Sequence, residues 1–318
     1  MHRIAILGLA LAMDLAMGEP RWFFLHPVRI IGRAVEALER FLRGPWPRMG
    51  GILLCVAIVF GTYAATAYLA NALDAFSRRS YLGTLVLAFL LYTTIALRGL
   101  TSEGTKIISL VASGDIETAR RQLKSLVGRD TENLDEGAIM KATVESLAEN
   151  ASDGVLAPVF YYLLGGLPLA MTYKAINTMD SMVGYRNERY RLFGWAAARL
   201  DDLANFIPAR LTGFFICLTS AAGGNGFLQP LMTMLRDGRK HPSPNSGVPM
   251  AAMAGALGVT LGGPASYGGV LIEKPFMGAG PPPLADEAKR AVKLTLRACL
   301  LGALAMALAS AALFHWLL

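Results

Sequence analysis

The feature that most constrains this chain is residues 52–71, a long apolar stretch without a single charged side chain. A helix that crosses the hydrocarbon core of a bilayer needs about 20 apolar residues at 1.5 Å each, which this stretch supplies. The rest of the chain agrees, because 54% of its 318 residues are hydrophobic and only 17% are charged. Soluble domains carry about 25% charged residues. The sequence therefore predicts an integral membrane protein.

Several other apolar segments follow the first. Residues 82–97, 155–173 and 298–318 are further candidate spans, although residues 155–173 include two prolines and two adjacent glycines. Residues 203–222 contain Pro208 and Arg210. A charge at membrane depth is costly unless it faces protein, water or a partner, so we expect this segment to be buried or re-entrant.

Two apolar segments are poor candidates for simple spans. Residues 4–17 are short and are followed by a poor cleavage region, which favours an uncleaved membrane anchor over a signal peptide. Residues 248–272 are uncharged but contain six glycines and two prolines, which disfavour a continuous helix. We expect a loop that dips into a protein-lined cavity.

The charge balance indicates membrane orientation and not nucleic-acid binding. The chain carries a net charge of +7, and part of the excess lies between two apolar segments, as expected of a cytoplasmic loop, at Arg21, Arg29, Arg33, Arg40, Arg43 and Arg48. Three cysteines, Cys55, Cys217 and Cys299, lie in apolar stretches with no short spacing. They predict buried reduced thiols, with neither a disulfide framework nor a zinc site.

Residues 98–153 differ from the rest because they are charged and helix-forming. Asp115 and Asn133 are candidate helix starts, and Gly128 is a candidate stop. Met140, Val144 and Leu147 form an apolar helical stripe. The predicted fold is an all-α, polytopic helical bundle with broken or re-entrant segments, a single membrane domain over residues 1–318 that includes a cytoplasmic helical insert at about 98–153.

The most informative polar run precedes residue 155. Glu145 and Glu149 are four positions apart and share a helix face, with Asn150 and Asp153 close behind. Mg²⁺ is bound by one or two carboxylates and completes its shell with water and phosphate, so this cluster predicts a magnesium site. A solvated acidic face would give the same spacing.

Two more polar clusters border broken apolar segments. Lys174, Asn177 and Asp180 share one helix face. The remaining members are Tyr185, Arg186, Asn187, Glu188 and Arg189 in the second cluster, and Asp201, Asp202, Asn205 and Arg210 in the third. Interfacial snorkelling and structural ion pairs are the alternative for any one residue.

A fourth cluster is a basic loop, residues 239–247, whose prolines preclude a helix. His241, Ser243, Asn245 and Ser246 offer donors that could surround a phosphate, although such loops also anchor chains beside membranes. The four histidines lack the paired spacing of zinc enzymes, which disfavours hydrolytic metal chemistry.

Taken together, these motifs resemble one family. They are GEPRW at 18–22 with HPV at 26–28, ENASDG at 149–154, KAINTMDSMVGY at 174–185 and HPSPNSG at 241–247. The chain resembles the CobD/CbiB family of cobalamin biosynthesis from about residue 8 to 275. One departure is Glu19, where the family pattern has Asp.

The resemblance implies an adenosylcobinamide-phosphate synthase of the inner membrane, with its active site facing the cytoplasm. Such an enzyme joins adenosylcobyric acid to (R)-1-amino-2-propanol phosphate, or ethanolamine phosphate, with Mg²⁺ and ATP. Cobalt enters only within the corrinoid substrate. Other late enzymes of the pathway are implied partners, and nucleic acid is not.

Within this resemblance, each polar cluster receives a role. Mg²⁺ is assigned to Glu145, Glu149 and Asp153, and the catalytic residues are Glu149, Lys174, Asp180, Asp201 and Asp202, of which one aspartate would deprotonate the amine. Substrate and phosphate binding is assigned to Asn150, Asn177, Tyr185, Arg186, Asn187, Arg210, His241, Ser243, Asn245 and Ser246. Two alternatives remain open, a scaffold for late corrinoid enzymes and a corrinoid transporter.

Overall fold

The computed structural model describes residues 2–18, 26–77, 81–185, 187–224 and 226–317, with side chains up to residue 313. Glu19 and Arg21 lie outside these residues. The chain forms two compact units, the first from residues 1–96, 157–205 and 305–318, and the second from residues 97–156 and 206–304.

The first unit is helical. Its elements are α1 (His2–Met17), α2 (Pro27–Leu42), α3 (Pro47–Ser77), α4 (Tyr81–Tyr92), α8 (Ala157–Val183) and α9 (Trp195–Ala204). The second unit contains α5 (Leu97–Ala112), α6 (Ile116–Leu123), α7 (Glu136–Ala151), a π-helical turn η1 (Ser152–Leu156), α10 (Phe206–Ala222), α11 (Leu228–Asp237), α12 (Gly247–Leu257) and four short strands. Helix α13 (Ala285–Leu317) contributes to both units.

Several helical stretches are long and apolar enough to cross a membrane. In the described part of the chain they are Pro47–Ser77, Tyr81–Ala112, Glu136–Val183 and Ala285–Leu313. Helices α9 and α10, separated at Asn205, add a fifth if they count as one interrupted span. The predicted class, a polytopic helical membrane protein with broken segments, is confirmed.

Helix α8 shows how one segment is broken. Gly165 and Gly166 have non-helical backbone angles, and Gly166 has a φ of 71°, which glycine adopts without steric cost. Pro168 follows at once and cannot donate a backbone hydrogen bond. The expected break within residues 155–173 therefore lies at these glycines.

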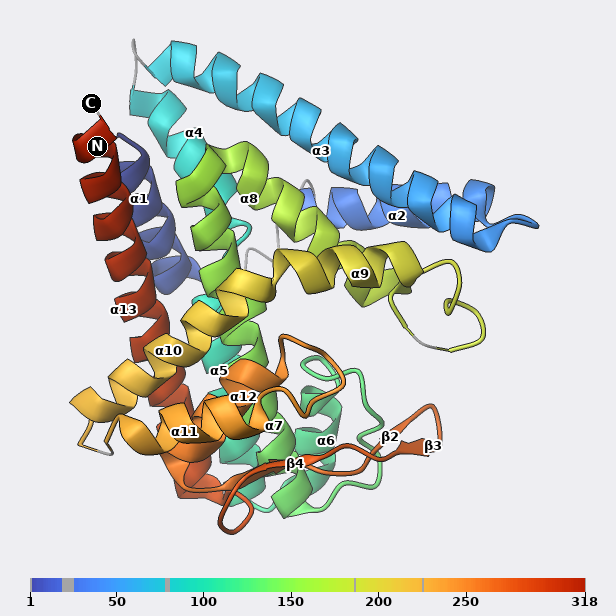
Figure 1. Cartoon of the computed structure of the whole chain (residues 1–318), viewed down its shortest axis with the longest axis vertical. Helices are drawn as coiled ribbons and strands as arrows, with labels where there is room; N and C mark the ends of the chain where they lie inside the picture. The colour runs from blue at the N-terminus through green and yellow to red at the C-terminus, as the bar shows by residue number, and fades with distance from the viewer. Residues whose placement is uncertain (1, 19–25, 78–80, 186, 225, 318) are drawn as a thin grey trace. The chain divides into compact units, whose positions relative to one another are not determined.

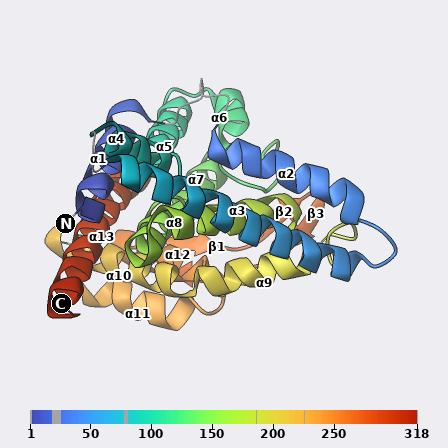
Figure 2. The same ribbon diagram turned by 90° about the horizontal axis from the view of Figure 1, so that it is seen from above.

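The core of the first unit forms where α2, α3, α8 and α9 meet. Figures 1 and 2 both show α2, α3 and α9 lying side by side. Helix α2 is amphipathic and buries Ile31 and Val35 in this core. The other core members include Leu54, Cys55, Ile58, Tyr173, Met179, Val183 and Phe193.

The second unit is built on two buried helices. Every residue of α12 is buried, as are ten of the sixteen residues of α7, including Met140, Val144 and Leu147 as predicted. The expectation for residues 248–272 needs correction, because the segment begins as this helix. Gly258, with a φ of 71°, ends it in the left-handed conformation that commonly terminates helices.

The strands that follow are the one departure from an all-α fold. Strand β1 (Thr260–Gly262) pairs antiparallel with β4 (Phe276–Gly278), and β2 (Ala265–Tyr267) pairs with β3 (Val270–Ile272). Gly268 and Gly269 connect β2 and β3, both with positive φ. A two-residue glycine turn of this kind suits a tight hairpin.

Helix capping in residues 98–153 was predicted correctly at one of two positions. The Asp115 side chain accepts a hydrogen bond from the Thr118 amide at 3.1 Å, as an N-cap does. The second start is not Asn133, because Asp135 accepts from the Ala138 amide at 2.7 Å and α7 begins at Glu136. Gly128 does not directly end α6, whose last residue is Leu123. The single-domain assignment and the cytoplasmic location of this insert stay predictions.

Candidate active site

In the second unit, residues 241–247, here called the serine loop, meet helix α7. The Ser246 hydroxyl donates to Glu149 Oε1 at 2.7 Å. The Ser243 hydroxyl lies 3.2 Å from that of Ser246 and accepts hydrogen bonds from the amides of Asn245 and Ser246. The structure thus brings together three residues that sequence analysis placed in two separate motifs.

The geometry of His241 determines its tautomer. Its Nδ1 accepts a hydrogen bond from the Ser243 amide at 3.1 Å, so in the neutral ring the proton lies on Nε2. Burial lowers the pKa of His241, and Lys274 adds to this effect, while Glu149 and Glu145 oppose it. A neutral imidazole with an Nε2–H donor can bind an anion without carrying charge itself.

Arg210 lies at the other side of the serine loop. Its Nη1 donates to Asn245 Oδ1 at 3.2 Å and to the Phe206 carbonyl at 2.6 Å. The guanidinium also lies 3.6 Å from the centre of the Phe206 ring. Arg210 and Asn245 are therefore in contact, and their role in phosphate binding stays a prediction.

Glu145 is buried, and both of its carboxylate oxygens have protein partners. Oε1 accepts from the Gly262 amide at 2.6 Å, and Oε2 forms an ion pair with Arg129. Its side chain is 3% exposed and that of Arg129 is 15% exposed. Sequence analysis did not identify Arg129, because no local spacing connects it with Glu145.

These contacts bear on the predicted magnesium site. Among the described residues, no three His, Cys, Asp or Glu side chains gather as a set that could hold a metal ion. Glu145 already neutralises Arg129, which makes it a poor ligand, whereas Glu149 has a hydroxyl partner at Oε1 and suits Mg²⁺ as a single carboxylate. The magnesium assignment therefore stays a prediction, with Glu149 as its best-placed member.

Asn150 and Asp153, the other two members of the polar run that begins at Glu145, lie in α7 and in η1. The Asn150 amide donates to the Ser146 carbonyl at 3.0 Å, within its own helix. Asp153 lies in the π-helical turn η1, which shifts it from the face expected of a regular helix. Turns of this type occur frequently at functional sites.

The first unit holds a second polar cluster, around Asp201. Asn205 donates to Asp201 Oδ2 at 3.0 Å and accepts from the Tyr173 hydroxyl at 2.8 Å. Asp201 Oδ1 is buried and has no hydrogen-bond partner among the described residues. Asp180 lies close enough for its charge to act on Asp201. Lys174 donates to Asn177 Oδ1 at 3.2 Å, which confirms that these two share a helix face.

The remaining predicted residues of the first unit are more exposed. Asp202 pairs with Arg199 at 3.6 Å, and Tyr185 is 48% exposed. Asn187 Oδ1 accepts from the Tyr190 amide at 3.0 Å and so caps a local turn. Arg186 lies outside the described residues. Tyr173, which contacts the Asp201 cluster through Asn205, was missed because it lies in an apolar run.

A sequence profile described as CobD/Cbib protein matches residues 7–295. The chain is 47% identical to the cobalamin biosynthesis protein CobD of Geobacter metallireducens over 90% of each chain. It is 42% identical to the protein of that name from Pelobacter propionicus, over 98% of this chain and 96% of the relative.

A third relative, cobalamin biosynthesis protein CobD of Clostridium perfringens, is 44% identical over 84% of each chain. No solved structure matches the chain. The profile match includes the motifs that form both polar clusters. The chain therefore belongs to the CobD/CbiB family of cobalamin biosynthesis proteins.

Proposed function

We propose that this protein joins adenosylcobyric acid to (R)-1-amino-2-propanol phosphate, or to ethanolamine phosphate, in an ATP-dependent amide ligation. The product is adenosylcobinamide phosphate. The observation that supports this proposal most strongly is family membership over residues 7–295, together with the polar clusters that the matched residues form.

The reaction requires an activated carboxylate, because a free carboxylate is a poor electrophile. One carboxylate oxygen of the corrinoid attacks the γ-phosphorus of ATP, so that an acyl phosphate forms and ADP leaves. The amine nitrogen then attacks the acyl carbon, the C–O bond breaks and inorganic phosphate leaves. The nitrogen loses two protons overall, one from the ammonium and one as the amide forms.

In the second unit, the serine loop supplies donors for phosphate oxygens. These are His241 Nε2–H and the positive end of α12, which begins at Gly247. Arg210 and Asn245 extend this surface. Charge-assisted hydrogen bonds of this kind stabilise the charge that develops on a transferring phosphoryl group.

Magnesium, when bound, would offset charge on that phosphoryl group. Glu149 would hold it, and Asp153 is the other candidate from the same motif. Glu145 instead positions the neighbouring backbone, because it binds the Gly262 amide and Arg129.

In the first unit, Asp201 is the proposed proton acceptor for the amine. Its buried Oδ1 can accept a hydrogen bond, while Asn205 orients the other oxygen and the Asn177 side chain also acts on this carboxylate. Lys174 and Asn177 are proposed to contact substrate charge beside it.

The proposed setting is the cytoplasmic side of the inner membrane, with corrinoid, amino-alcohol phosphate and lipid as partners. Other late enzymes of the pathway are proposed to dock there. Cysteines introduced at positions 187 and 245 test the orientation, because both should be labelled from the cytoplasm. Labelling of either from the periplasm contradicts it.

The direct test is turnover by the detergent-purified chain with adenosylcobyric acid, aminopropanol phosphate and MgATP, with the amide product followed by mass spectrometry. Product that depends on all three supports the ligase. A folded preparation that binds the corrinoid without turnover favours the scaffold. Corrinoid counterflow in proteoliposomes without turnover favours the transporter.

A further inference from the structure

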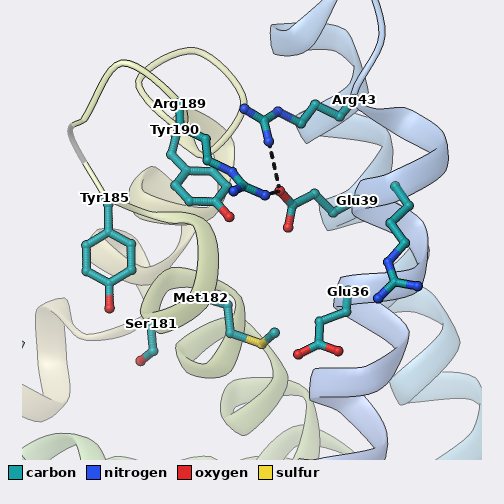
Figure 3. Close-up of a pocket in the computed structure, with 9 residues that line it drawn as sticks. Glu36, Glu39, Arg43, Ser181, Met182, Tyr185, Arg189 and Tyr190 are labelled. Carbon is teal, nitrogen blue, oxygen red and sulfur yellow. Dashed lines mark hydrogen bonds and ion pairs between the residues drawn. The ribbon is translucent and has the colours of Figure 1, made fainter.

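The first unit contains a cavity of about 590 Å³ that no step of the proposed reaction uses, although one of its lining residues, Tyr185, belongs to the predicted substrate-binding set. Its walls come from the C-terminal half of α2, the end of α8 and the turn that follows α8, as Figure 3 shows. The lining residues are Glu36, Glu39, Arg40, Arg43, Ser181, Met182, Tyr185, Arg189 and Tyr190. The lining is thus mostly charged or aromatic.

Two arginines on opposite walls meet at one carboxylate oxygen. Glu39 Oε1 lies 3.5 Å from Arg43 Nη1 and 3.1 Å from Arg189 Nη2. The Glu39 side chain is 12% exposed, whereas those of Arg43 and Arg189 are 34% and 58% exposed. The carboxylate is therefore enclosed while both cations remain accessible from solvent.

An aromatic ring holds both guanidinium groups in place. The Tyr190 ring centre lies 5.7 Å from the guanidinium carbon of Arg43 and 5.1 Å from that of Arg189. Because stacking restrains the two side chains, less conformational entropy is lost when they bind an anion. Cationic groups restrained in this way make a preorganised anion site.

The charge of the lining favours an added anion. Arg40, Arg43 and Arg189 give three positive charges, and Glu36 and Glu39 give two negative ones, which leaves a net charge of +1. A phosphate group has several acceptor oxygens and matches the planar fork of arginine, so it can engage both guanidinium groups at once. A carboxylate already bound between them marks where such an anion fits.

The surroundings point to two sources of phosphate. Phe41, between Arg40 and Arg43, and Trp46, three residues after Arg43, are 85% and 78% exposed, as in the aromatic belts at membrane surfaces. At that level a lipid phosphate and a soluble phosphomonoester both have access. Their shared chemistry is the phosphate group.

We propose that this cavity is a phosphate-binding site, in which Arg43 and Arg189 release Glu39 and bind the oxygens of the incoming phosphate. Arg40 adds positive charge at its edge, and Tyr185 and Tyr190 flank the bound group. This site is independent of the proposed ligase, because its assignment needs neither ATP nor the corrinoid.

Binding to the full chain, purified in detergent and washed free of lipid, tests the proposal. Inorganic phosphate and glycerol 3-phosphate, a phosphomonoester that is not a substrate of the proposed ligase, are titrated by calorimetry. Retention of phosphatidylglycerol and phosphatidylcholine is followed by native mass spectrometry. The double variant R43Q/R189Q should weaken binding of the true source by about tenfold or more, as expected when charged hydrogen bonds are lost. The matched control R33Q/R191Q removes the same charge at two exposed arginines that do not line the cavity and should leave binding unchanged.

Each result has a distinct meaning. Arginine-dependent binding of glycerol 3-phosphate or phosphate identifies a soluble ligand, and arginine-dependent retention of phospholipid alone identifies a head group. If none of the four probes binds, or if R43Q/R189Q binds them as the unsubstituted protein does, the proposal is wrong. None of these results depends on turnover, so failure of the ligase would not affect them.

A second variant separates binding from folding. E39Q removes the carboxylate that competes for the arginines and should tighten phosphate binding at an unchanged melting temperature. Weaker or equal binding by a folded E39Q protein contradicts the exchange of Glu39 for phosphate.

Discussion

The Ser246 hydroxyl donates a hydrogen bond to Glu149 Oε1 at 2.7 Å, although the two residues lie 97 positions apart in the sequence. This bond joins the motif at 149–154 to the motif at 241–247 within the second unit. It orients the carboxylate that we consider best placed for magnesium. The two motifs therefore act on one side chain.

Loss of the Glu149 charge should abolish most turnover. E149Q keeps the shape of the side chain but removes the charge, so we expect turnover to fall by about 10²-fold or more. S246A should have a smaller effect, because Glu149 keeps its charge and loses only its orienting donor. Turnover with mass-spectrometric detection checks both. E136Q, at an exposed position in the first turn of α7, is the control, and equal activity of E149Q and E136Q would remove Glu149 from the site.

The neutral state of His241 predicts a pH dependence of stability. Its pKa is lowered by burial, so below about pH 6.5 the unfolded chain binds a proton that the folded chain does not. Stability should therefore be fully present above that pH and should fall as the pH drops through the lowered pKa. H241N keeps an acceptor near the position of Nδ1 and cannot titrate. Between pH 8 and pH 5, the melting temperature of H241N should fall less than that of the unsubstituted protein. Parallel curves of melting temperature against pH would contradict the assignment.

The sequence predicted the membrane helices well, because that signal is local. Residues 52–71 lack charge throughout, and the structure extends them into α3. The broken segments were also foreseen, since Gly165, Gly166 and Pro168 each disfavour regular helix through their own backbone chemistry. The first residue of α7 was not predicted, because Asn133 and Asp135 can both act as an N-cap and only packing selects between them.

The sequence named residues of the candidate site but did not predict which of them are in contact. Glu149 and Ser246 were both named from motifs, but no spacing rule connects residues from distant helices and loops. Arg129 and Tyr173 were missed for the same reason, since their partners lie 16 and 32 positions away. The strands after residue 259 were missed because runs rich in glycine favour loops until cross-strand pairing is formed.

Breaking the buried ion pair should destabilise the second unit. R129A leaves Glu145 charged, buried and uncompensated, which costs about 3–5 kcal/mol in comparable pairs. Adding E145Q to R129A should recover part of this loss, because the buried charge is then removed. Chemical denaturation in detergent measures both. K124A breaks the exposed pair of Lys124 with Glu132 and should change stability little, so an equal loss in K124A would contradict the argument.

Two glycines of α3 should respond oppositely to alanine. A Cβ at Gly51 would lie 1.8 Å from the Phe193 carbonyl oxygen, so G51A must push the two segments apart. Overpacking of this kind costs about 1–3 kcal/mol or more. A Cβ at Gly61 meets nothing within 4 Å, and alanine favours helix, so G61A should keep or raise the melting temperature. Equal melting temperatures for the two variants would show that the close contact of α3 with Phe193 is wrong.

The two adjacent aspartates of α9 should differ sharply in their effect on turnover. Asp201 is oriented by Asn205 and has a buried oxygen without a hydrogen-bond partner in the described part of the chain, whereas Asp202 pairs with Arg199 and its side chain is 26% exposed. If Asp201 accepts the proton of the amine, D201N should lower kcat by about 10²–10⁴-fold, the usual range for general-base catalysis. D202N should retain most activity. Both variants should keep the elution volume and the melting temperature of the unsubstituted protein. Activity of D201N close to normal would move the proton acceptor away from Asp201, to Asp202 if D202N loses activity and to Asp180 if D202N does not.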